Sequence, residues 1–277
     1  MRSVIPALVA WASLILEAPA SSLTSGCRPL RFRLIVAARL SLIIGTLGTT
    51  LMTAQAAEPA LTSGASAYQT GPRSEDGIGK FYEGREIAQI MGYAGASWLE
   101  RPSRKTEERT DILLQELRLA RGMVVADIGA GSGFLSRQIG PEIAPATLYA
   151  VDVQPQMVAM LKNLATQPGT RNLVPVLAAV NDVKLPAGVV DVAVLVDVYH
   201  ELEFPLELMR SVVRALKPGG RVVFVEYRGE DPQLPIKPLH KMTQMQVRRE
   251  MRALPVVWER TNERLPLQHV IVFRKIA

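Results

Sequence analysis

The chain has 277 residues, enough for one large domain or two small ones with a substantial buried core. Its formal net charge is +6, from 32 basic and 26 acidic residues, but residues 1–57 hold five of the basic residues and one of the acidic ones. The rest of the chain therefore has 27 basic and 25 acidic residues, and this near balance gives little support to nucleic-acid binding. The single cysteine, Cys27, excludes a disulfide framework, a cysteine nucleophile and a zinc–thiolate site from the rest of the chain.

Residues 1–57 have the pattern of a leader with an export signal. The apolar run Leu40–Met52 follows three arginines and precedes Ala54-Gln55-Ala56, a small-residue cleavage pattern. Because the run is shorter than the roughly 20 residues that span a bilayer as a helix, we expect cleavage after Ala56 and an exported, periplasmic protein. An uncleaved leader would instead anchor the chain in the inner membrane. The signal begins late, so translation of residues 1–29 stays open.

Two segments precede the main domain. Residues 58–80 are rich in Ala, Ser, Gly and Thr and are expected to be a flexible linker. Residues 81–109 are expected to form an N-terminal cap segment, with a short amphipathic helix within 81–91 because Ile87, Ile90 and Met91 have helical spacing. Trp98 and the charged run 104–109 either pack on the domain with solvated charges or close over a site as a lid.

From residue 110 the pattern alternates between strands and helices. Thr110 is expected to cap a helix over Asp111–Leu119, and the apolar strand Val124–Ile128 leads through a glycine turn into a helix that Gly140-Pro141 should end. Further strands are predicted at 147–152, 173–177, 189–196 and 222–227, with a charged helix at 242–254 and a hairpin from 256–258 and 270–273. Continuous apolar strands separated by helices predict an α/β fold, a doubly wound parallel sheet with helices on both faces and an antiparallel C-terminal hairpin.

The glycine turn indicates a nucleotide-like ligand. Gly129, Gly131 and Gly133 allow a turn that delivers a ligand to the following helix, but Phe134 stands where the dinucleotide fingerprint has its third glycine. A carboxylate at Asp127 would oppose a pyrophosphate and favour a ligand with an ammonium group, unless it bonds its own turn. Asp152, at the end of the next strand, can accept ribose hydroxyls of either ligand.

Taken together, these residues resemble class I S-adenosylmethionine-dependent methyltransferases. The segment 127–133 looks like the first motif of that family, 150–152 like its second, 181–182 like its adenine-reading position and 216–221 like the turn before its fifth strand. The resemblance covers about residues 110–277, the expected methyltransferase domain. It is nearest to small-molecule members that act on quinone precursors, and segments 197–202 and 224–228 also resemble uncharacterised exported bacterial members.

The resemblance implies a seven-stranded sheet whose last strand is antiparallel, and S-adenosyl-L-methionine as the cofactor. Asp152 would hold the ribose, Asp182 the adenine amine, and the glycine turn the methionine portion, while Asp197 is a further candidate contact. The expected cofactor-binding residues are Asp127, Gly129, Ala130, Gly131, Gly133, Asp152, Val153, Asn181, Asp182 and Asp197.

Candidate catalytic residues lie at the carboxyl ends of the fourth and fifth strands, because ligands of doubly wound sheets bind there. They are Tyr199, His200, Glu226 and Tyr227. His200 is the candidate base because imidazole titrates near neutrality; the alternative is a helix-start residue held by a hydrogen bond.

The other two histidines have less specific surroundings. His240, with Lys237 and Lys241, either binds an anionic acceptor or lies in a solvated loop, and His269 is expected to be structural. Since the three histidines are scattered along the sequence without metal-ligand spacing, we expect no metal.

The methyl acceptor is expected to be a small or lipid-like molecule. The sequence has no Asn-Pro-Pro-Tyr motif after the fourth strand, which disfavours methylation of adenine amines in nucleic acid, and membrane contact is expected only through an uncleaved leader. Two alternatives stay open: a nicotinamide-dependent oxidoreductase, which Asp127 and the glycine spacing disfavour, and a non-catalytic nucleoside-binding protein of the same fold.

Overall fold

The computed structural model describes residues 67–276, which fall within one compact unit. The leader, its cleavage pattern and residues 58–66 lie outside the described residues. Within 67–276, no helix combines the length and the hydropathy needed to cross a membrane.

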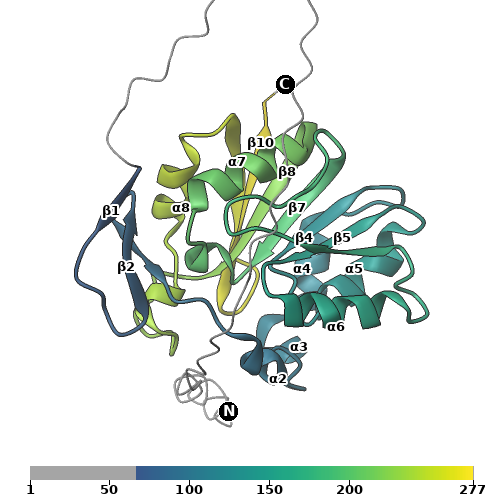
Figure 1. Ribbon diagram of the computed structural model, residues 1–277, viewed down its shortest axis with the longest axis horizontal. Coiled ribbons are helices and arrows are strands. Elements are labelled where there is room, and N and C mark those ends of the chain that lie inside the picture. The colour runs from purple at the N-terminus through teal and green to yellow at the C-terminus, as the bar shows by residue number, and fades with distance from the viewer. Residues whose placement is uncertain (1–66, 277) are drawn as a thin grey trace, which may run out of the picture. The chain divides into compact units, whose positions relative to one another are not determined.

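A seven-stranded sheet forms the centre of the main domain (Figure 1). Its strand order is β6-β5-β4-β7-β8-β10-β9, and β10 pairs antiparallel with both β8 and β9 while the other pairs are parallel. This confirms the predicted mostly parallel sheet with a C-terminal hairpin. The strands are β4 (Val125–Ile128), β5 (Leu148–Asp152), β6 (Leu173–Leu177), β7 (Val190–Val196), β8 (Leu216–Tyr227), β9 (Val256–Asn262) and β10 (Gln268–Lys275).

Helices cover both faces of this sheet, as the continuous apolar strands predict. One core cluster packs apolar side chains of α4, α5 and α6 against one face, and a second packs those of α7 and α8 against the other. Alternate residues of each strand join opposite clusters, as Val125 and Ala126 of β4 do. The helices are α4 (Thr110–Leu117), α5 (Ser136–Ile143), α6 (Pro155–Ala165), α7 (Pro205–Ala215) and α8 (Gln244–Met251).

Three elements have boundaries that differ from the predicted ones. Helix α5 continues through Gly140 and Pro141 to Ile143. Ile143 is fully buried, and the free energy gained by burying it offsets the one hydrogen bond that Pro141 cannot donate. Helix α4 includes Thr110, whose side chain caps nothing, and ends at Leu117 rather than residue 119. Strand β8 starts at Leu216, which pairs with β7 before the chain bulges over residues 217–220.

The largest correction concerns residues 67–91. A small antiparallel sheet, β1 (Tyr68–Thr70), β2 (Gly77–Tyr82) and β3 (Arg85–Ala88), replaces the end of the expected linker and the expected helix. Glu83 and Gly84 both have positive φ, 49° and 85°, the conformation of a two-residue hairpin turn. Tyr82 and Ile87 are buried in the core cluster of α7 and α8, so tertiary packing outweighs the helical spacing of Ile87, Ile90 and Met91.

Candidate functional site

Two cavities lie at the carboxyl ends of the central strands. The first, which we call the glycine-turn cavity, is lined by residues that follow β4, β5 and β7, among them Gly129, Gly131, Asp152, Val153 and Val198. The second, the histidine cavity, is lined by His200, His240 and residues of the cap segment. Three residues line both cavities, namely Met91, Leu99 and Glu201, so the two cavities are neighbours.

The glycine turn is built by its backbone. The N–H groups of Gly129 and Ala130 both donate to the carbonyl of Val151, at 2.8 and 3.0 Å, which ties the turn to the end of β5. Gly129 has φ +72°, and a Cβ there would lie 2.5 Å from Val198 Cγ2. Only glycine fits this position, and it keeps the floor of the cavity open. Gly129 and Gly131 line the cavity, whereas Ala130 and Gly133 do not.

Asp152 lies in the glycine-turn cavity with its carboxylate held from two sides. Oδ2 accepts from the N–H of Gly131 at 2.9 Å, and Oδ1 accepts from the N–H of Gln154 at 2.8 Å. Burial raises the pKa of Asp152, and these backbone donors oppose the rise without cancelling it. The carboxylate is therefore a fixed acceptor for hydroxyl groups of a ligand.

Asp127 has a different role from the expected one. It is buried, accepts a 2.6 Å hydrogen bond from Ser136 Oγ, and does not line either cavity. Burial raises its pKa to about 6, against the opposing hydrogen bond from Ser136. The carboxylate thus joins the strand before the turn to the helix after it. This is similar to the alternative in which Asp127 bonds its own turn.

Asn181 and Asp182 also lie outside both cavities. The Asp182 carboxylate accepts from the N–H of Lys184 at 2.8 Å and from Arg214 Nη2 at 3.1 Å. The hydrogen bond from Lys184 is the main cause that lowers the pKa of Asp182. Of the same loop, Ala178 and Val183 line the glycine-turn cavity instead.

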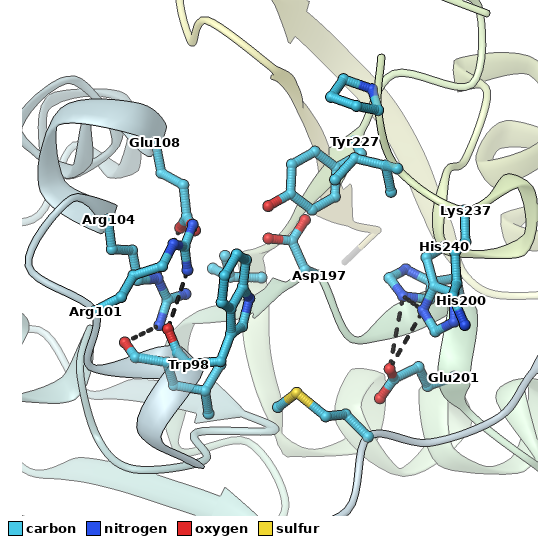
Figure 2. Close-up of a pocket in the computed structure, with 15 residues that line it drawn as sticks. Trp98, Arg101, Arg104, Glu108, Asp197, His200, Glu201, Tyr227, Lys237 and His240 are labelled. Carbon is cyan, nitrogen blue, oxygen red and sulfur yellow. Dashed lines mark hydrogen bonds and ion pairs between the residues drawn. The ribbon is translucent and has the colours of Figure 1, made fainter. Parts of the chain in front are cut away.

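The histidine cavity has a volume of about 290 Å³ and is assembled from segments far apart in the chain (Figure 2). Its walls come from the cap, the end of β7, the end of β8 and the loop before α8. Figure 2 shows the cap residues on one side, His200, Glu201 and His240 on the other, and Asp197 and Tyr227 between them. The lining residues are Met91, Trp98, Leu99, Arg101, Arg104, Glu108, Val196, Asp197, His200, Glu201, Tyr227, Pro235, Ile236, Lys237 and His240.

The cap segment closes over this cavity, and Arg104, Glu107 and Glu108 of its charged run are buried, whereas Lys105 and Arg109 are exposed. It comprises the 3₁₀ turn η2 (Tyr93–Gly95) and helices α2 (Ala96–Leu99) and α3 (Arg104–Glu108). Arg101 pairs with Glu107 and Glu108, each at 2.9 Å, and its guanidinium lies 4.1 Å from the centre of the Trp98 ring. Arg104 pairs with Glu108 at 2.9 Å. The lid interpretation therefore fits, and the arginines of this wall already have carboxylate partners.

Asp197 and Tyr227 line the histidine cavity at the ends of β7 and β8. Asp197 has φ +52°, and its Oδ2 accepts from Gln268 Nε2 at 2.8 Å. Its buried Oδ1 has no hydrogen-bond partner within residues 67–276. Burial raises the pKa of Asp197 and of the Tyr227 hydroxyl. Asp197 therefore offers a spare acceptor to a ligand of the histidine cavity, not of the glycine-turn cavity where it was expected.

His200 is held in one orientation by Glu226. Its Nδ1 lies 2.6 Å from Glu226 Oε2, and Glu226 Oε1 accepts from the N–H of Tyr199 at 2.9 Å. Burial lowers the pKa of His200, but the charge and hydrogen bond of Glu226, helped by Glu201, outweigh it and leave the pKa raised. With Nδ1 bound to a carboxylate, Nε2 is the nitrogen left to act. Glu226 is fully buried and lines neither cavity, so it positions His200.

Tyr199, expected to be catalytic, belongs to the core. It is fully buried, and its hydroxyl donates to Glu250 Oε2 at 2.6 Å on the side of α8. It lines neither cavity.

His240 lies in the loop before α8 but is buried, so the alternative of a solvated position is wrong for this residue. His240 ends the 3₁₀ turn η4 (Pro238–His240), is 2 % exposed, and has its Nδ1 3.2 Å from Nε2 of His200. Lys237 lines the cavity and pairs with Asp76, whereas Lys241 Nζ donates to the Asp231 carbonyl at 3.1 Å. His269 is buried on β10 and lines neither cavity.

Comparison with known proteins agrees with this geometry. Residues 126–224 match the family model described as a methyltransferase domain. This part of the chain is therefore similar to methyltransferase domains. The matched region carries most of the glycine-turn cavity, whereas the cap, Tyr227 and His240 lie outside it.

Individual relatives of the methyltransferase domain cover only part of the chain. A tRNA U34 carboxymethyltransferase of Desulfotalea psychrophila is 28% identical over 119 residues, 43% of this chain and 37% of that protein. A ubiquinone biosynthesis O-methyltransferase of Vibrio parahaemolyticus is 31% identical over 117 residues, 42% of this chain and 48% of that protein. The chain thus spans less than half the length of these curated relatives.

A solved structure shows the same fold over a larger share of the chain. The SAM-dependent methyltransferase from Aquifex aeolicus superposes with a TM-score of 0.63 at 22% identity, covering 68% of this chain and all of that one. The seven-stranded sheet is therefore the class I methyltransferase fold.

Proposed function

We propose that the methyltransferase domain binds S-adenosyl-L-methionine in the glycine-turn cavity and transfers its methyl group to a small molecule held in the histidine cavity. The observation that carries this proposal is the adjacency of the two cavities, which have Met91, Leu99 and Glu201 in common. In-line transfer needs donor sulfur and acceptor atom on opposite sides of one methyl group, so two adjoining cavities supply the required arrangement.

The residues of the glycine-turn cavity suit the parts of this cofactor. Asp152 is placed to accept both ribose hydroxyls, and the turn at Gly129 and Gly131 leaves room for the methionine portion. We assign the adenine to the side lined by Ala178 and Val183, because the Asp182 carboxylate already has two partners.

In the reaction, the nucleophilic atom of the acceptor forms a bond to the methyl carbon while the carbon–sulfur bond breaks and its electron pair stays on sulfur. The sulfonium loses its positive charge, and an acceptor hydroxyl releases its proton to water. His200, with its ring fixed by Glu226, belongs to the cluster that faces the acceptor. Tyr227 and the spare oxygen of Asp197 supply polar contacts that orient it.

The size and charge of the histidine cavity favour a small, uncharged acceptor. Its volume, about 290 Å³, lies near the lower end of ordinary small-molecule sites. The carboxylates of Glu108, Asp197 and Glu201 line it beside the cations Arg101, Arg104 and Lys237, so the cavity has no excess of positive charge that would attract a polyanion such as nucleic acid. One relative is named for its action on tRNA and another for ubiquinone biosynthesis, and this cavity suits the second kind of acceptor better.

Calorimetry on the full chain tests the cofactor. We expect S-adenosylmethionine and S-adenosylhomocysteine to bind with one site per chain and NAD to show no binding, because Phe134 stands where the dinucleotide fingerprint has its third glycine. Binding of NAD alone would instead support an oxidoreductase. Incubation of small-molecule extracts with methyl-labelled cofactor should label a product; cofactor binding without any labelled product would support a non-catalytic binding protein.

We also propose that the protein is exported to the periplasm. The apolar run 40–52 with arginines before it and Ala54-Gln55-Ala56 after it supports this. N-terminal sequencing of protein recovered from the periplasm is expected to begin at Ala57. A mature chain that begins at Met1 would contradict cleavage, and its fractionation with membranes would support an uncleaved anchor.

A further inference from the structure

Three side chains bring ligand atoms to one point where the two cavities meet. Nε2 of His200 lies 3.2 Å from Nδ1 of His240, and Oε1 of Glu201 lies 3.5 Å from Nδ1 of His240 and 3.9 Å from Nε2 of His200. Figure 2 shows Glu201 facing both imidazole rings. Tetrahedral ligands bound at about 2.0–2.1 Å lie about 3.3–3.4 Å from one another. The three atoms therefore already have nearly the spacing of ligands around one metal ion.

The surroundings of this cluster are those of a preformed metal site. The side chains of both histidines are 2 % exposed and that of Glu201 is 10 % exposed, so these polar groups are withdrawn from water and directed at each other. Behind the cluster, Glu226 holds Nδ1 of His200 at 2.6 Å. A carboxylate that binds the second nitrogen of a histidine is the usual support of a metal ligand, since it fixes the ring and increases the basicity of the ligating nitrogen.

We propose that His200, Glu201 and His240 bind one divalent transition-metal ion, such as Zn²⁺, with an open coordination position facing the histidine cavity. Two imidazole nitrogens and one carboxylate are the ligand set of zinc sites that leave the fourth position to water or substrate. Imidazole ligands favour transition metals over Mg²⁺ and Ca²⁺, which prefer oxygen. The site could not be predicted from the sequence, because His200 and His240 are 40 residues apart. Strand β8 and the loop that follows it bring the two side chains together only in the folded chain.

The proposed metal site indicates the chemical class of the methyl acceptor, an inference that rests on the proposed function. An acceptor hydroxyl that takes the open position has its pKa lowered by the ion and releases its proton to water. The resulting oxygen nucleophile attacks the methyl group, and the metal keeps its oxidation state. The expected acceptor is therefore a hydroxylated molecule, such as a phenol or an enol, and Nε2 of His200 acts as a ligand instead of as the base.

Titration with Co²⁺ tests the metal site without any turnover. The full chain, purified with a tag that contains no histidine and stripped with a chelator, is expected to bind one Co²⁺ and to show the visible absorption of cobalt with nitrogen ligands, which one equivalent of Zn²⁺ removes. Glu201→Gln and His240→Gln should each weaken Co²⁺ binding at least about tenfold. Glu203→Gln, the same change at an exposed position two residues away, should leave it unchanged.

Two results would overturn the metal site: no Co²⁺ binding by the unaltered chain, or binding that Glu201→Gln and His240→Gln leave as tight as in the unaltered chain. Circular dichroism and calorimetry with S-adenosylmethionine on each variant show whether it is folded. A chain that binds S-adenosylmethionine but not Co²⁺ refutes the metal and leaves the proposed function standing. Binding of Co²⁺ without S-adenosylmethionine refutes the proposed function and leaves the metal site.

Discussion

Replacing Asp152 with asparagine is expected to weaken the binding of S-adenosylmethionine about 100-fold or more. The carboxylate is fixed by the N–H groups of Gly131 and Gln154 and can accept from two ribose hydroxyls. Asparagine has the same shape, but it loses the charge and turns one acceptor into a donor that faces either a backbone N–H or the ribose. Hydrogen bonds to a charged group contribute about 1.5–3 kcal/mol each, and about 1.4 kcal/mol corresponds to a factor of ten in affinity. Calorimetry on the full chain measures the loss.

Asp111→Asn is the matched control for this variant. Asp111 is exposed on α4 and pairs only with its neighbour Arg109, at 2.7 Å, among the described residues. Its replacement should leave cofactor affinity unchanged. If Asp152→Asn also bound S-adenosylmethionine as tightly as the unaltered chain, the ribose would have to bind elsewhere.

Replacing Arg85 with methionine is expected to lower the free energy of unfolding by about 3–5 kcal/mol. Nε and Nη2 of Arg85 on β3 donate to the two oxygens of Glu250 on α8, at 2.9 and 3.1 Å, and Nη1 donates to the carbonyl of His200 at 3.0 Å. The Glu250 side chain is fully buried, so the variant leaves its charge without a cation. Urea denaturation followed by circular dichroism gives the free energy of unfolding.

Two further variants separate the buried charge from the loss of packing. Arg85→Met combined with Glu250→Leu removes both charges and should recover part of the lost stability, since an apolar pair of similar size often replaces a buried ion pair without loss. The recovery is limited because the buried Tyr199 hydroxyl loses its acceptor, Glu250. Arg109→Met breaks an exposed pair, 45 % and 57 % exposed, and should change stability by about 1 kcal/mol or less. A loss for Arg85→Met no larger than that for Arg109→Met would contradict the expected role of the buried pair.

The main sheet could be predicted because each of its strands and helices has a recognisable pattern within its own short segment of sequence. Each buried strand, such as Val190–Val196, is a continuous apolar run, and each helix after it has its own spacing of apolar residues. The small N-terminal sheet could not be predicted in this way. Ile87, Ile90 and Met91 have helical spacing, and only the contact of Tyr82 and Ile87 with the core of the main domain makes an extended hairpin the better solution.

In the candidate site, too, residues that belong to a local motif could be predicted, whereas residues whose role depends on tertiary contacts could not. Gly129, Gly131 and Asp152 could be predicted because each belongs to a short local motif, the glycine turn at 127–133 or the strand end at 150–152, and all three line the glycine-turn cavity. Tyr199 and Asp182 also follow strands, but side-chain direction and ion pairing, which no motif records, take them out of the cavities.

Several residues of the histidine cavity, among them His200, Tyr227 and His240, could be singled out from the sequence, but their assembly into one cavity could not, since it depends on contacts between distant segments. Trp98, Arg101 and Glu108 of the cap meet Tyr227 and His240 only when the chain is folded. A charged run with a tryptophan nearby was a weak signal for a lid. The burial of His240 had no signal at all in the sequence around it.

Because Met91, Leu99 and Glu201 line both cavities, occupancy of one cavity changes the environment that the other offers its ligand. Such a coupling is reciprocal by thermodynamic necessity. If a bound acceptor alters the affinity for S-adenosylmethionine by some factor, S-adenosylmethionine alters the affinity for the acceptor by the same factor. Under the proposed function, the same reciprocity holds between the affinity for the methylated product and the affinity for S-adenosylhomocysteine.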